Sequence, residues 1–173
     1  YSSENYHKLY ELLQWEKNHL LEKGDEQMME KMDNIYNEEK RAISVLDEST
    51  ELRIVYDKAA ALLMSAGHAR DEEKVKEFKK ILEIPVMQDA GALQTFYNKT
   101  FFYDIYVAYF SFVRDFQNYY DYLLKVEELY DSHPDEKKRK HVNYVLMIHN
   151  QLSGCLYIKE YGKYEEVMEK YKK

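Results

Sequence analysis

The sequence predicts an all-helical protein, and three observations carry this prediction. Gly (5) and Pro (2) are scarce among the 173 residues, whereas loop-rich and all-β folds need more turn residues. Apolar residues recur at helical spacing along nearly the whole chain. Turn-like segments return every 45 residues or so, as expected of stacked helix hairpins. We therefore expect one domain, residues 1–173, folded as an all-α solenoid of about four antiparallel helix hairpins.

Helix breakers and apolar spacing place each element in turn. The first helix breaks at Gly24 and the third at Gly67. The fourth ends before Pro85, because a residue that precedes proline is pushed out of the helical region. Segment 85–91 is expected to be irregular, and Ser132 with Pro134 marks a capped helix start. The expected helices cover residues 3–23, 26–47, 50–66, 71–83, 92–113, 116–131, 135–159 and 162–172.

A 45-residue shift aligns four expected hairpin turns, at 23–26, 68–71, 113–116 and 158–161. Columns around these turns also agree, with apolar residues eleven positions after the third turn residue in every unit. The last two units agree best. This register divides the chain into repeats at 3–47, 50–84, 92–131 and 135–172.

The last two units resemble the tetratricopeptide repeat. Residues 154–164 (GCLYIKEYGKY) look like the centre of such a unit, and residues 109–116 (YFSFVRDF) look like another. The spacing of 45 is longer than the 34 residues of that family. The segments around Trp15 and Gly24 are also similar to bacterial proteins with long, degenerate repeats of this type.

The resemblance implies a superhelix whose concave groove binds a protein or peptide. It implies no substrate. Transferring the family's groove positions column by column gives candidate partner-binding residues. They are Gln14, Asn18, Asp104, Ala108, Ser111, His149, Ser153 and Tyr157.

Composition limits the other functional classes. The net charge of −7 argues against a dominant role on nucleic acid or on anionic membranes. The single cysteine excludes an intrachain disulfide and a cysteine-based zinc site. No apolar run is long enough to span a bilayer and no signal peptide is visible, so we expect a cytoplasmic protein. Eighteen tyrosines suit half-buried helix layers and surfaces that grip a partner.

Few residues suggest chemistry, and each has a simpler interpretation. Glu4-x-x-His7 and Glu16-x-x-His19 match a di-iron ligand pair, but both lie on one expected helix and face different ways. Cys155 is expected to be a buried small hydrophobe rather than a nucleophile. Histidines at 133, 141 and 149 are too far apart to share a metal ion. The basic run 137–140 follows acidic residues, as in a solvated first helical turn. We therefore expect no catalytic residue, metal or cofactor.

The stretch 101–110 (FFYDIYVAYF) is apolar all round, which predicts a helix buried on several sides. In a solenoid this is expected of a central helix, one face of which can also line the groove. A protein- or peptide-binding scaffold is thus the expected function. The alternatives are a sensor module that signals to a domain outside this chain and a self-associating structural subunit.

Overall fold

A computed structural model describes residues 3–23, 27–66 and 72–172 of the chain, and every regular element in these residues is helical. The all-α class predicted from the sequence is therefore confirmed. None of the described helices combines the length and apolarity that crossing a membrane requires. The elements are α1 (Ser3–Lys23), α2 (Met28–Ala66), α3 (Glu72–Leu82), the 3₁₀ helix η1 (Pro85–Met87), α4 (Phe96–Val113), α5 (Phe116–Asp131), α6 (Pro134–Arg139), α7 (His141–Tyr157) and α8 (Tyr161–Tyr171).

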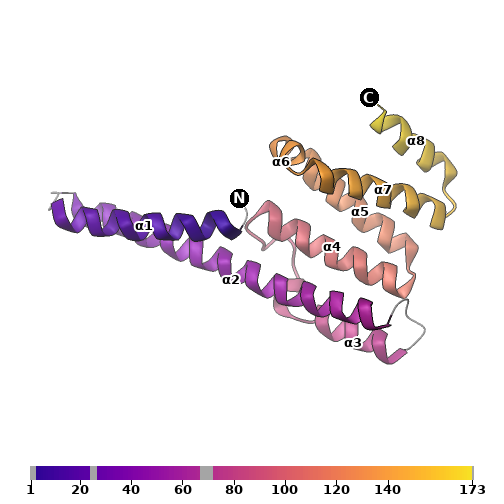
Figure 1. Cartoon of the computed structure of the whole chain (residues 1–173), viewed down its shortest axis with the longest axis horizontal. Helices are drawn as coiled ribbons and strands as arrows, with labels where there is room; N and C mark the ends of the chain where they lie inside the picture. Colours follow the sequence, from indigo (N-terminus) through magenta and orange to yellow (C-terminus); the bar gives the residue numbers. More distant parts are fainter. Residues whose placement is uncertain (1–2, 24–26, 67–71, 173) are drawn as a thin grey trace.

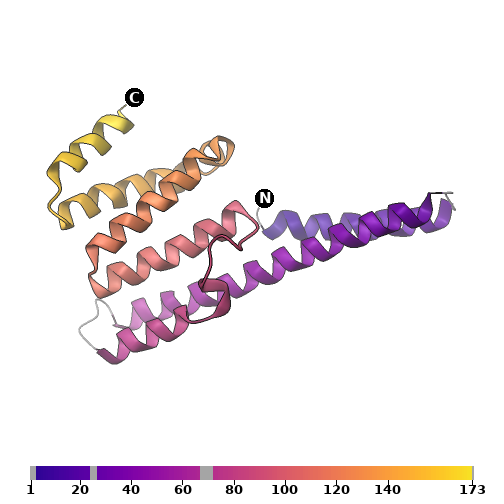
Figure 2. The same ribbon diagram turned by 180° about the vertical axis from the view of Figure 1, so that it is seen from behind.

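The molecule consists of a long helical arm joined to a stack of helices. Figure 1 shows α1 lying along the first half of α2, and this pair projects away from the remaining helices. The second half of α2 packs against α3 and α4, and α5, α7 and α8 follow in order on the far side of α4 (Figures 1 and 2). The single helix α2 therefore belongs to both the arm and the stack.

The arm is held by two mainly apolar seams with coiled-coil spacing, each interrupted by one charged residue, and these two residues, Lys17 and Glu39, pair with each other at 3.0 Å. The inward residues of α1 recur at alternating steps of four and three, and Leu13 is buried among them. Those of α2 follow the same steps through Ile35 and Ala42, which are also buried. This alternation averages 3.5 residues, so each seam stays turned toward its partner along the arm. The two seams are formed by residues 6, 10, 13, 17 and 20 of α1 and residues 28, 32, 35, 39 and 42 of α2.

The expected break between residues 47 and 50 was wrong, because α2 continues through it. Two of the polar residues there, Glu48 and Ser49, are bonded to the start of α4 and so do not need to end a helix. Glu48 accepts hydrogen bonds from the backbone of Gln94 and the side chain of Asn98. Ser49 donates to the side-chain amide oxygen of Asn98 at 2.9 Å. Thr50 donates to the backbone oxygen of Leu46 at 2.8 Å. The boundary between the first two expected repeats thus falls inside one helix.

Helix α4 is packed on two sides and joins two hydrophobic clusters. Phe102, Ile105 and Phe112 lie in one cluster with residues of α2, α3 and η1. Phe96 and Val107 lie in the other, with residues of α5 and α7. The prediction that stretch 101–110 is buried on several sides is therefore confirmed, although Phe101 and Asp104 stay exposed.

The two C-terminal turns have the same backbone geometry, 45 residues apart. Arg114 and Lys159 adopt left-handed conformations, with φ of 59° and 61°. The next residue in each turn donates its backbone N–H back into the preceding helix. Asp115 donates to Phe110 at 3.0 Å, and Glu160 donates to Cys155 at 2.9 Å. These bonds satisfy carbonyl groups that a helix end leaves free. The other two expected turns, at 23–26 and 68–71, lie largely outside the described residues.

Three other boundaries differ from the sequence predictions. Helix α4 starts at Phe96 rather than residue 92, because the Thr95 side chain caps it by accepting a hydrogen bond from the Asn98 backbone. The expected helix 135–159 is divided at Lys140 into α6 and α7. Pro134 does open α6, but no side chain caps that helix. The end before Pro85 is confirmed, since α3 stops at Leu82.

Substitution of Asp47 by proline tests the continuity of α2. Asp47 is exposed, so its side chain contributes little to packing. Proline inside a helix removes one backbone hydrogen bond and clashes with the preceding turn, which costs about 3 kcal/mol or more. We expect urea unfolding to show this loss for Asp47→Pro, and a change within about 0.5 kcal/mol for the control Asp47→Ala. Equal stability of the two variants would mean that separate helices meet near residue 47.

Candidate functional site

A groove of about 490 Å³ lies between α4 and α7, with α5 beneath it and α2 at one end. Consecutive layers of the helical stack therefore converge on one concave surface. Its lining residues are Tyr56 from α2, Thr100, Asp104, Val107, Ala108 and Ser111 from α4, Tyr119, Leu123, Val126 and Tyr130 from α5, and Asn143, Leu146, Met147 and Asn150 from α7.

Helix α4 contributes a narrow strip of small and polar side chains. Thr100, Asp104, Ala108 and Ser111 follow one another at steps of four, four and three, so they lie on one helix face. The flanking faces of α4 are committed to the two hydrophobic clusters. The strip is therefore the part of this apolar helix that is left to meet solvent or a ligand.

The groove has an apolar floor and a polar rim. Leu123 and Val126 of α5 form the floor and are each 2% exposed. On the α7 side, Leu146 is 57% exposed, and the side-chain amides of Asn143 and Asn150 have no hydrogen-bond partner among the described residues. An apolar floor with a few free polar groups at its edge is the usual character of a ligand site.

Asp104 is the only charged residue among the described residues that line the groove. It forms no hydrogen bond or ion pair within the described part of the chain. Surrounding protein desolvates the carboxyl group and raises the pKa of Asp104 to about 7, although water still reaches its side chain. Desolvation and the Asp104 carboxylate, in that order, raise the pKa of Tyr130 to about 12.

Three of the eight predicted groove residues line this groove, namely Asp104, Ala108 and Ser111. Gln14 and Asn18 lie instead on α1 in the arm. The Gln14 amide donates to Glu39 of α2, and Asn18 is exposed.

The predicted residues of α7 lie outside the lining set. His149 is exposed, and Ser153 donates to the His149 backbone oxygen at 3.1 Å. Tyr157 stacks on Phe116 of α5, with ring centroids 4.4 Å apart. The groove lies between α4 and α7, so α7 lines it with the flank that faces α4. Transferring positions from α4 to α7 by the 45-residue repeat selects a neighbouring face of α7, which does not line the groove.

Sequence reasoning missed Tyr56 of α2 and the lining residues of α7. One signal for the latter was present. Asn143, Leu146 and Asn150 follow helical steps of three and four, and they alternate polar with apolar side chains next to the buried Met147. That pattern marks the border between a buried and an open helix face.

The arm contains a second concavity of about 560 Å³ between α1 and α2. Leu9, Leu12 and Ala42 are among its apolar lining residues. Glu38 and Arg41 at its edge lie 4.0 Å apart and pair with each other. We favour the groove over this cleft, because the groove presents polar groups that have no partner.

The other candidate chemical groups have ordinary surroundings. Cys155 is fully buried, as expected. His19 stacks on Trp15, whereas the side chain of Glu4 lies outside the described residues. No cluster of three or more His, Cys, Asp or Glu side chains suited to a metal occurs in the described ranges. In the basic run, Lys137 pairs with Asp131 at 2.8 Å.

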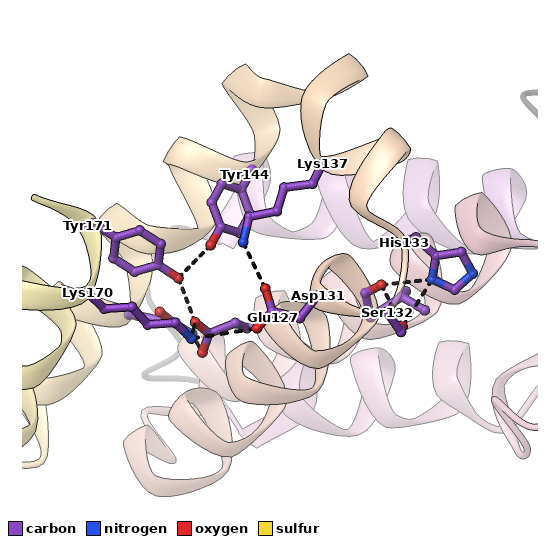
Figure 3. Close-up of polar contacts among 10 residues, drawn as sticks. Glu127, Asp131, Ser132, His133, Lys137, Tyr144, Lys170 and Tyr171 are labelled. Carbon is purple, nitrogen blue, oxygen red and sulfur yellow. Dashed lines mark hydrogen bonds and ion pairs between the residues drawn. The ribbon is translucent and has the colours of Figure 1, made fainter. Parts of the chain in front are cut away.

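A polar network fastens α8 to the stack (Figure 3). Glu127 of α5 accepts hydrogen bonds from Lys170, from the Tyr171 hydroxyl at 2.6 Å and from the Gln151 amide at 3.0 Å. The Tyr144 hydroxyl donates to the Tyr171 oxygen at 3.0 Å. Burial, followed by the bonds to Glu127 and Tyr144, raises the pKa of Tyr171, so its hydroxyl keeps its proton. Every carboxylate, ammonium and hydroxyl group in this network has a partner, which indicates a structural role.

Comparison of the chain with protein-family models, with curated protein sequences and with solved structures finds no match. The interpretation of the groove therefore rests on its own geometry and chemistry.

The network at Glu127 predicts a pH-dependent contribution to stability. Desolvation acts to raise the pKa of Glu127, but the hydrogen bonds from Lys170, Tyr171 and Gln151 outweigh it, and the pKa is lowered. A carboxyl group with a lowered folded pKa stabilises the fold above its unfolded pKa, and this stabilisation is lost as pH falls through the folded value.

We expect Glu127→Gln to cost about 1–3 kcal/mol at pH 7 in urea unfolding, and less at pH 3.5. The exposed neighbour Glu128 provides the matched control Glu128→Gln, for which we expect little change at either pH. Equal effects of the two substitutions at pH 7 would contradict the anchoring role of Glu127.

Proposed function

We propose that this protein is a scaffold or adaptor that binds a protein or peptide segment in the groove between α4 and α7. The observation that carries the proposal is the convergence of unpartnered polar groups from two helices above an apolar floor. Such an arrangement can bury apolar side chains of a ligand while its backbone bonds the free amide and hydroxyl groups of the rim.

The proposal includes a tetratricopeptide-like superhelix over the C-terminal part of the chain. Two features support it: the equal geometry of the turns after α4 and α7, and the position of α2, α4 and α7 around one groove that has α5 as its floor. In this arrangement α2, α4 and α7 are the first helices of successive hairpins, and α3, α5 and α8 are the second helices. Short repeats of this kind gain their stability from packing against their neighbours.

A binding role fits the groove better than catalysis does. Among its described lining residues, Asp104 has no histidine, cysteine or lysine beside it that would complete a set for acid–base or nucleophilic chemistry. The proposal therefore includes no cofactor and no bond-making step.

Self-association is a second candidate, and the arm supplies the observation for it. Met29, Tyr36 and Ile43 lie seven residues apart on α2 and are 74%, 45% and 51% exposed. Such a stripe is typical of a helix that pairs with another helix. Sedimentation of the chain distinguishes the candidates, because a dimer with no peptide binding would favour self-association as the main role.

Selection from a random ten-residue peptide library displayed on phage tests the proposed function. We expect selected peptides to bind the wild-type chain and to lose affinity about 5- to 30-fold for Leu146→Ala, as for removal of about 1–2 kcal/mol of apolar contact. Fluorescence polarisation measures this change in Kd.

Leu156 provides a matched control, because it lies on the same helix with similar exposure, 51%, but does not line the groove. The Kd of Leu156→Ala should equal that of the wild type. An equal loss for both variants, or failure to select any peptide, would contradict binding in the groove.

A further inference from the structure

The described lining residues of the groove include one negative charge and no positive charge to balance it. The polar residues that line the groove with Asp104 from the other helices are neutral: Tyr56 on α2, Tyr130 on α5, and Asn143 and Asn150 on α7. Elsewhere in the described chain, part-buried acidic side chains do have polar partners: Glu39 has Lys17, Glu127 has Lys170, and Glu48 accepts hydrogen bonds from amide groups. Asp104, whose carboxyl group is desolvated by the surrounding protein, has no such partner among the described residues.

Because Asp104 has no cation, its charge is unfavourable in the free protein. Desolvation without a compensating partner is the cause of its raised pKa. A cation brought by a ligand would remove this penalty and would gain strength from the concave, partly dehydrated surroundings. The same contact would be worth little at an open surface.

We propose that the groove binds a short, extended segment of a partner protein that carries a lysine or arginine, whose charged group pairs with Asp104. This inference rests on the proposed binding function and names the chemistry of the partner. The lysine or arginine stem would lie along the apolar floor, at Leu123 and Val126, while the segment's backbone meets Asn143 and Asn150 at the rim.

The free side-chain amides of Asn143 and Asn150 favour an extended segment over a helix, because the backbone groups of a helical ligand are already paired with one another. The α4 strip from Thr100 to Ser111 is roughly 16 Å long at the 1.5 Å rise per residue of a helix. An extended chain rises about 3.3 Å per residue, so about five residues would span the strip.

The experiment uses peptides selected from the ten-residue library on the full chain. We expect them to share a lysine or arginine at one position. Replacement of that residue by norleucine, or of arginine by citrulline, should weaken binding at least tenfold to the wild type. For Asp104→Asn the charged and neutral peptides should bind equally. Asp33 is exposed on α2 in the arm, so Asp33→Asn is the control and should behave as the wild type.

The pH dependence gives a readout that a purely structural role of Asp104 would not produce. With a pKa of about 7 in the free protein, most of the Asp104 carboxyl is neutral at pH 6 and ionised at pH 8. A peptide without His, Asp or Glu should therefore bind the wild type about tenfold more weakly at pH 6 than at pH 8. This difference should vanish in Asp104→Asn, which removes an unpaired charge and should remain folded.

The outcomes separate this inference from the proposed function. If the selected peptides lack a shared lysine or arginine but lose affinity for Leu146→Ala, the pairing of a cation with Asp104 is wrong and binding in the groove still holds. The pairing is also wrong if Asp104→Asn still binds the charged peptide more tightly than the neutral one. Tight binding of spermine in place of any peptide would overturn the assignment to a protein segment. Failure to select any peptide would overturn both proposals together.

Discussion

The rest of the structure depends on the two-sided burial of α4. Its aromatic and branched side chains enter both hydrophobic clusters, so α4 joins the layer made by α2 and α3 to the layer made by α5 and α7. Phe78 of α3 packs against Phe112 from one side, and Tyr130 of α5 packs against Phe96 from the other. A helix covered on two flanks has one narrow face left, and in α4 that face is the strip that lines the groove.

The length of α2 is the second constraint on the structure, because this one helix runs through both the arm and the stack. Its first half pairs with α1 through coiled-coil spacing, and its second half supplies Leu52, Val55 and Ala59 to the cluster under α4. The two environments meet near Glu48 and Ser49, where hydrogen bonds from the start of α4 satisfy the polar side chains. A rigid helix thus fixes the arm relative to the groove.

Local signals made much of this fold predictable. Pro85, the apolar spacing and the turns at 113–116 and 158–161 placed most helix ends, because each of these signals lies in the residues of the helix end itself. The boundary at 47–50 failed because Glu48 and Ser49 are bonded to residues far away in the sequence. A prediction from neighbouring residues alone places a helix end at such polar residues. A tertiary contact can instead satisfy them inside a continuous helix.

The sequence could identify groove-lining residues only on α4, where the pattern of apolar residues determines which face stays open. Transfer of the tetratricopeptide groove positions selected Asp104, Ala108 and Ser111, and these residues coincide with the one polar strip that the apolar residues of α4 leave. Helix α7 has apolar residues on its exposed faces too, such as Val142 and Val145, so its sequence does not determine which face is buried. The rotation that it adopts over α5 decides which of its flanks faces α4. Gln14 was misplaced because α1 pairs with the arm half of α2 and does not join the stack.

The most direct test of this account is to map, by NMR, the amide chemical-shift changes that a selected peptide causes in the isotope-labelled chain. We expect the largest changes on residues 100–111 of α4 and 143–150 of α7, with little change along the arm. Changes that are concentrated on α1 and the first half of α2, or on α3 and α8, would contradict the claim that the strip on α4 is the binding face.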